Sequence, residues 1–151
     1  MKPPDDTGLV WIRLPGKKGS LPLFREFVLK QAREADLSGP VQMKLDLVVE
    51  EVLLNVFHYA FEKGQTGDVA VGCGMVPEQG FVMRVMDPGR PFNPLEQPPP
   101  DTTSDVAERK VGGLGIFLTR KMSSALAYDR REDHNILDIF FNEPEDSPTA
   151  P

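Results

Sequence analysis

One segment of this 151-residue chain, LDLVVEEVLLNVFHYAF at residues 45–61, limits the folds open to it more than any other. Most of its positions are apolar, so a helix here must be buried on nearly all sides. Within it and just after it, polar residues recur at spacings of four, three and four: Glu51, Asn55, His58 and Glu62. These spacings place their side chains on one face. The segment therefore predicts a central helix with one narrow polar stripe.

The polar stripe carries residue types that suit phosphate chemistry. Asn55 supplies a neutral oxygen of the kind that Mg²⁺ accepts as a ligand. Glu51, one turn earlier, can take a proton from an attacking hydroxyl. His58 fits a supporting or core position better than a catalytic one. The stripe also has a simpler interpretation, in which it is only the solvent face of an amphipathic helix.

The alternation of apolar and polar residues predicts an α/β fold. We expect helices at residues 21–35, 41–61 and 114–124, the first capped by Ser20. We expect strands at residues 8–14, 68–76, 81–86, 126–130 and 136–141. This order predicts a two-layer sandwich, with a mixed sheet covered on one face by helices. Residues 1–141 are expected to form a single domain, and the polar, proline-rich residues 142–151 a disordered tail.

Composition excludes several classes of protein. The net charge of −6 argues against a nucleic-acid partner, because phosphate contacts need clustered Lys and Arg. The one cysteine, Cys73, has no second cysteine to pair with and is expected to be a small buried hydrophobe in a strand. No signal peptide or membrane span is apparent in the sequence, so a cytoplasmic location and no membrane partner are expected.

A long irregular stretch at residues 87–113 follows the third expected strand, and such loops inside compact domains are usually functional. It opens with Asp87-Pro88-Gly89. An aspartate leaving a strand can accept a hydrogen bond from an exocyclic amino group such as that of adenine. Gly89 permits a close backbone approach or a positive φ that a side chain would resist. The alternative is an ordinary Asp-Pro-Gly turn.

The same stretch ends in a glycine cluster, Gly112-Gly113-Leu114-Gly115, which opens the last expected helix. Free backbone N–H groups and the helix dipole favour phosphates there. Arg109 and Lys110 lie just before it and could reach the same phosphates. The spacing is not GxxxxGK[ST], so this is not a P-loop. A plain packing turn is the alternative interpretation.

Taken together, Glu51-x-x-x-Asn55, Asp87-x-Gly89 and Gly113-x-Gly115 resemble the N box and two glycine boxes of the GHKL ATPase superfamily. The segments VEEVLLNVFHYAF, DPGRPFNP and ERKVGGLGIFLTRKM look more narrowly like the RsbW/SpoIIAB group of anti-sigma factor serine/threonine kinases. The resemblance covers about residues 9–141. It implies a Bergerat-type sandwich, with ATP held between the helices under a lid at about residues 95–111.

The resemblance also assigns roles to residues. It implies that Glu51 is the general base, that Asn55 is the Mg²⁺ ligand and that Asp87 contacts adenine. Arg25, on the first helix, falls where this group has an arginine that docks protein partners. The residues implied to contact or shape the nucleotide site are Asn55, His58, Asp87, Gly89, Arg109, Lys110, Gly113, Leu114 and Gly115.

The function implied by the resemblance is a switch kinase. Its substrate would be a STAS-domain anti-anti-sigma protein, its competing partner a sigma factor or other output protein, and its oligomeric state a homodimer. Two alternatives remain: a nucleotide-binding module without phosphate transfer, and the catalytic domain of a sensor histidine kinase. The chain departs from the superfamily pattern at Pro91, where a second glycine is common. Its proline-rich lid also aligns no basic residue uniquely with the family's phosphate-contacting arginine.

Overall fold

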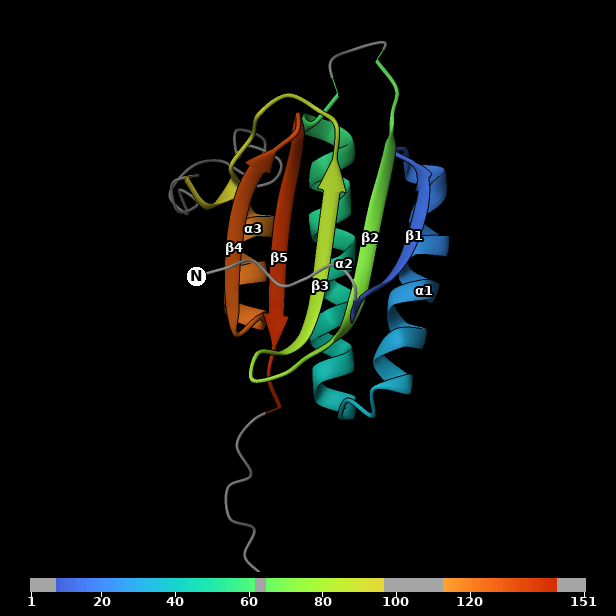
Figure 1. Ribbon diagram of the computed structural model, residues 1–151, viewed down its shortest axis with the longest axis vertical. Coiled ribbons are helices and arrows are strands. Elements are labelled where there is room, and N and C mark those ends of the chain that lie inside the picture. Colours follow the sequence, from blue (N-terminus) through green and yellow to red (C-terminus); the bar gives the residue numbers. More distant parts are fainter. Residues whose placement is uncertain (1–7, 62–64, 97–112, 144–151) are drawn as a thin grey trace, which may run out of the picture.

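The computed structural model describes residues 8–61, 65–96 and 113–143, without the side chains of 113–115. Within these residues, five strands form one sheet in the order β1-β2-β3-β5-β4. The helices of the described residues all lie on the same face of this sheet (Figure 1). The two-layer α/β sandwich with helices on one face is therefore confirmed.

The helix layer is made of α1 (Leu21–Glu34), α2 (Gly39–Tyr59) and α3 (Gly113–Met122). Ser38 caps α2, since its Oγ accepts a hydrogen bond from the N–H of Val41 at 3.3 Å. The expected cap at Ser20 is wrong, because this residue has helical φ and ψ and its side chain makes no capping bond. A short 3-10 turn, η2 (Lys18–Ser20), leads into α1 instead.

The sheet contains β1 (Val10–Pro15), β2 (Asp68–Val76), β3 (Gly80–Asp87), β4 (Ala125–Arg131) and β5 (His134–Phe141). All four pairings between these strands are antiparallel, so the expectation of a mixed sheet is wrong. The physical reason is the position of β5, which lies between β3 and β4. Because α3 returns the chain, β4 runs in the same direction as β3, but the two strands are not neighbours.

The core lies between the sheet and the helices. Its α2 residues include Leu45, Val49 and Leu53, all fully buried, and they pack against alternate residues of the central strands. Cys73 belongs to this core, and burial raises the pKa of its thiol. It is the small buried hydrophobe that the sequence predicts.

Two residues of the expected tail are held by the domain. The N–H of Asn142 donates to Ser124 Oγ at 2.8 Å, and a Glu143 carboxylate oxygen accepts from the N–H of Ser38 at 2.7 Å. The expectation for residues 144–151 lies outside the described residues.

Candidate functional site

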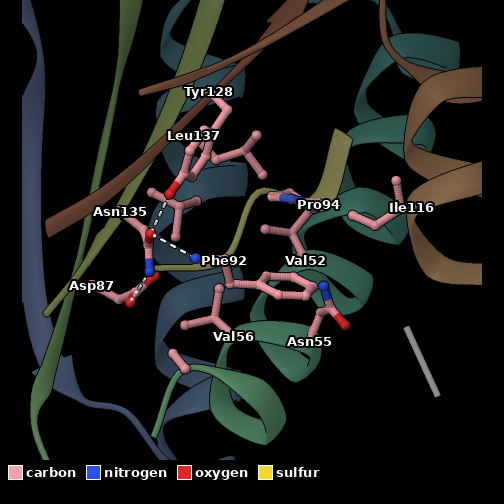
Figure 2. A pocket seen from close by; sticks show the side chains of 12 residues that line it. Val52, Asn55, Val56, Asp87, Phe92, Pro94, Ile116, Tyr128, Asn135 and Leu137 are labelled. Atoms are coloured by element: carbon pink, nitrogen blue, oxygen red, sulfur yellow. Dashed lines mark hydrogen bonds between the residues drawn. The ribbon is translucent and has the colours of Figure 1, made fainter. Parts of the chain in front are cut away.

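A pocket opens where the C-terminal half of α2 faces the ends of β3 and β5, and it encloses about 410 Å³ including open solvent. The chain segment after β3 and the start of α3 complete its walls (Figure 2). The lining residues are Val52, Asn55, Val56, Ala60, Val85, Asp87, Phe92, Pro94, Ile116, Tyr128, Asn135 and Leu137.

Asp87 is the last residue of β3 and is buried at one end of the pocket. Its Oδ1 accepts hydrogen bonds from the N–H of Gly89 at 2.9 Å and from Asn135 Nδ2 at 3.0 Å. Burial raises the pKa of the Asp87 carboxyl; these two hydrogen bonds and the charges of Arg130 and His134 oppose that rise. The pocket therefore presents a carboxylate acceptor in an otherwise largely apolar wall.

Asn135 is a site residue that the sequence reasoning missed. Its Nδ2 donates to Asp87 and to the carbonyl of Arg90 at 2.8 Å, while its Oδ1 accepts from the N–H of Phe92 at 3.2 Å and from the Tyr128 hydroxyl. The strands expected at residues 126–130 and 136–141 leave it in the turn between them. The structure makes it the second residue of β5, directly paired with Asp87 in the register.

Asn55 lies on α2 at the other end of the pocket, with Phe92 between it and Asp87 (Figure 2). Its side chain is buried, and its Oδ1 receives no hydrogen bond from any described residue. A buried acceptor without a donor costs stability, so such an atom in a pocket points to a ligand. An Mg²⁺ ion fits this atom, because Mg²⁺ typically takes one or two protein oxygens and fills its other positions with water and phosphate oxygens.

The part of the chain that the structure describes holds no cluster of metal-ligating side chains. In residues 8–61, 65–96 and 113–143, no group of three or more His, Cys, Asp or Glu side chains could hold a metal ion. An Mg²⁺ ion held by Asn55 would take its other ligands from water and nucleotide phosphates.

Glu51 lies one turn before Asn55 but lines a different hollow, a groove between α2 and α3. The described part of the chain gives its carboxylate no hydrogen bond or ion pair. Partial burial and the adjacent Glu50 charge raise the pKa of Glu51 above its ordinary value. A carboxylate with a raised pKa is a stronger base when ionised. The structure thus places Glu51 and Asn55 on one side of α2, facing α3, but in two adjoining hollows.

Gly89 is required by a close approach of two backbones. A Cβ at this position would lie 2.2 Å from the carbonyl oxygen of Ala60, at the C-terminal end of α2. The next residue fixes the contact, since the N–H of Arg90 donates to that oxygen at 3.0 Å. Gly89 therefore shapes the pocket by holding the segment after β3 against α2, and its close partner is the protein's own backbone.

The remaining predicted site residues lie in different places, and not all of them are near the pocket. His58 is exposed and contacts Tyr59 edge-on, so it neither lines the pocket nor belongs to the core. Arg25 forms a two-point ion pair with Asp46 of α2, at 2.9 and 3.0 Å. Gly113, Leu114 and Gly115 open α3 as expected, whereas Arg109 and Lys110 lie outside the described residues, as does Glu62.

Comparison with known proteins identifies the class that this fold and pocket define. A model of the histidine kinase-like ATPase domain matches residues 14–141, and the chain belongs to this family. Membership of an ATPase family implies that the chain binds ATP. In the described residues, no helix is both long and apolar enough to cross a membrane.

Two characterised relatives narrow the resemblance. The serine-protein kinase RsbW of Listeria monocytogenes is 28% identical over 113 residues, covering 72% of this chain and 71% of the relative. The serine/threonine-protein kinase BtrW of Bordetella bronchiseptica is 24% identical over 102 residues, covering 68% of this chain and 71% of the relative. These similarities confirm the resemblance to the anti-sigma factor kinase group.

Proposed function

We propose that this chain is an ATP-dependent serine/threonine kinase that phosphorylates a STAS-domain anti-anti-sigma protein in the cytoplasm. In the same proposal it sequesters a sigma factor or other output protein. The observation that carries the proposal is the arrangement on α2, where the unpartnered Asn55 Oδ1 lies in the pocket and the Glu51 carboxylate lies one turn away. The two relatives named as serine or threonine kinases support the same reaction class.

The positions of three residues along α2 and the pocket suggest a different role for each. Asp87 would accept a hydrogen bond from the adenine amino group at its own end of the pocket. Asn55 would help to hold Mg²⁺, which when bound neutralises charge on the phosphates and the transferring group. Glu51 would take the proton of the incoming hydroxyl as its oxygen bonds to the γ-phosphorus and the bond to the β-phosphate oxygen breaks, leaving ADP.

The kinase proposal is tested by incubating the full-length protein with γ-labelled ATP, Mg²⁺ and each purified STAS-domain protein of the same genome. We expect acid-stable label on a serine or threonine of one of them. Glu51→Gln should retain ATP affinity and lower the transfer rate at least 100-fold, since the amide cannot take the proton. Acid-labile label on a histidine, or full activity in Glu51→Gln, would contradict the proposal. Tight ATP binding without label on any STAS-domain protein would favour the non-transferring module.

The metal-binding role of Asn55 has a test of its own. Asn55→Leu should lower Mg–ATP affinity about tenfold or more while changing affinity for ATP in EDTA much less. The same substitution should raise the free energy of unfolding by about 1 kcal/mol, because it removes a buried acceptor that has no donor. Calorimetric titrations and urea unfolding measure the two effects. Equal losses with and without Mg²⁺ would contradict metal ligation.

A further inference from the structure

Exposed apolar side chains of α2 lie beside the groove that contains Glu51, and half-buried apolar side chains of α3 face them. Leu47 lines this groove and is 51% exposed, and Met43, one turn earlier on the same face, is 72% exposed. Leu118 and Met122 of α3 line the facing wall. We call these four residues the apolar shelf.

The groove and the proposed nucleotide site are lined by successive turns of the same helix, α2. On α2, Met43, Leu47, Glu51 and Asn55 follow one another at intervals of four residues, and each step turns the side chain by about 40° around the helix. The apolar shelf therefore ends at Glu51, and the ATP pocket begins one turn later at Asn55. A molecule lying on the shelf would reach the Glu51 carboxylate from the side opposite the nucleotide.

The size of the groove indicates what kind of molecule it accepts. It contains about 240 Å³ of space including open solvent, against about 410 Å³ for the ATP pocket measured in the same way. The exposed area on Met43 and Leu47 extends beyond it along the helix. A hollow of this size beside a wider apolar surface suits one side chain of a protein partner, and methionine adapts to different partner shapes.

We propose that the apolar shelf binds the segment of the protein substrate that carries the accepting hydroxyl. This inference rests on the proposed kinase function. Residues four apart on a helix are displaced by about 6 Å along its axis. When the substrate hydroxyl meets Glu51, a substrate side chain on Leu47 must be about 6 Å away. Alternate residues of an extended segment are separated by about 6.6 Å and point to the same side. The favoured substrate therefore has a large apolar residue two positions from its serine or threonine.

Methionine methyl signals test the docking surface without relying on phosphate transfer. The chain has six methionines. Two of them, Met43 and Met122, belong to the apolar shelf, while Met75 on β2 is 53% exposed and serves as an exposed control outside it. The full chain, labelled with ¹³C at its methionine methyls and loaded with Mg–ADP, is titrated with each STAS-domain protein of the same genome.

We expect one STAS-domain protein to shift or broaden the Met43 and Met122 signals and to leave Met75 unchanged. This result without phosphate transfer would support the docking surface and overturn the kinase function. Transfer with unchanged Met43 and Met122 signals would overturn the docking surface alone. If no STAS-domain protein binds, the docking inference and the proposed partner both fail.

A pair of leucine variants tests the shelf by kinetics. Leu47 and Leu23 are on helices and are similarly exposed, at 51% and 53%, but Leu23 lies on α1 and does not line the groove. Leu47→Ser should raise KM for the STAS-domain protein about tenfold while leaving ATP affinity unchanged, and Leu23→Ser should change neither. Equal effects of the two substitutions, or no effect of Leu47→Ser, would overturn the proposal.

Discussion

The two hydrogen bonds that the structure gives Asp87 end on the same carboxylate oxygen, Oδ1. Within the described residues, Oδ2 receives none. Asn135 and the N–H of Gly89 therefore fix the orientation of the carboxylate and leave its second oxygen for a donor on a ligand. An adenine amino group is such a donor, whereas guanine presents a carbonyl oxygen at the corresponding ring position.

Asp87→Asn should weaken ATP binding while keeping the hydrogen bonds that Asp87 makes within the protein. The amide can keep its oxygen at Oδ1 for the two existing bonds, but it then places an N–H₂ donor where the ligand also presents a donor. We expect ATP affinity to fall about 10- to 100-fold, as for loss of a hydrogen bond to a charged group. Titration calorimetry measures this change, and unchanged affinity would rule out the adenine contact.

The stability of the same variant should depend on pH in a defined direction. Burial raises the pKa of Asp87 in the folded protein, so its contribution to stability is fully present below the unfolded pKa and is lost as pH rises through the folded pKa. In Asp87→Asn this pH-dependent loss of stability is absent, because an amide does not ionise. In urea unfolding, the variant should gain stability relative to wild type as pH increases from 4 towards 7. A constant difference across that range would contradict the raised pKa.

At the residue level, sequence reasoning identified residues with a distinctive local pattern and missed one that depends on strand pairing. Asn55 and Asp87 were found because a helical stripe and a strand-ending aspartate are visible in the sequence, and both line the pocket. Asn135 has no such pattern, since its importance comes from being paired with Asp87 across β3 and β5. His58 shares the spacing of the stripe but is exposed, because a stripe on a helix can extend past the pocket it lines.

Among the secondary-structure elements, the contact between the C-terminal end of α2 and the segment after β3 is the critical one for the pocket. Arg90 joins the two through its backbone bond to Ala60 and through its side chain, which donates to the carbonyl of Tyr59 at 2.9 Å. Phe92 stacks on Tyr59 with ring centroids 5.7 Å apart. From the sheet side, Arg130 of β4 donates to the carbonyl of Gly89 at 2.7 Å. Both layers thus hold this segment.

Gly89→Ala should disrupt that contact. The added methyl group would lie 2.2 Å from a backbone oxygen that cannot move without unwinding the end of α2. We expect a loss of about 2–3 kcal/mol in unfolding free energy, as for overpacking, and a parallel loss of ATP affinity. Gly39→Ala is the matched control, because a Cβ there meets nothing within 4 Å, and it should be neutral or slightly stabilising. Similar stability of the two variants would show that the segment can shift freely.

The elements themselves were largely predictable, and their pairing was not. Hydrophobic periodicity predicts each helix and strand of the described residues to within two residues at each end. Residues 39 and 40 were expected to precede the second helix, but Ser38 caps it and Gly39 begins it. Strand direction depends on which strands become neighbours. Periodicity does not contain that information, so the insertion of β5 between β3 and β4 could not be read from the sequence.

In the molecule as a whole, apolar packing against the helices stabilises one face of the sheet, and a buried ion pair lies on the other. The helices pack on one face (Figure 1). On the other face, Arg84 of β3 and Asp138 of β5 form a buried ion pair, with Nε–Oδ1 and Nη2–Oδ2 distances of 2.6 and 2.9 Å. A buried pair tolerates the loss of one partner poorly. It therefore favours the β3–β5 pairing that also brings Asp87 beside Asn135.

The ATP pocket is built from both layers of the sandwich, so nucleotide binding should stabilise the entire fold. Its lining comes from α2 and α3 in the helix layer, from β3, β4 and β5 in the sheet, and from the segment after β3. Unfolding any of these elements destroys the site, so the binding free energy adds to the free energy of unfolding. At an ATP concentration 100 times its Kd, this addition is about 2.7 kcal/mol.

For a domain of this size, the added free energy corresponds to an increase in Tm of about 5–10 °C. Scanning calorimetry with Mg–ATP should show this increase as a shift of one cooperative transition. The shift should be smaller for Mg–GTP, because guanine presents a carbonyl oxygen to Asp87 at the ring position where adenine presents its amino group. Asn55→Leu should lose most of the Mg²⁺-dependent part of the shift. If ATP stabilised only part of the molecule, the transition would split in two, and the pocket could not be the joint product of both layers.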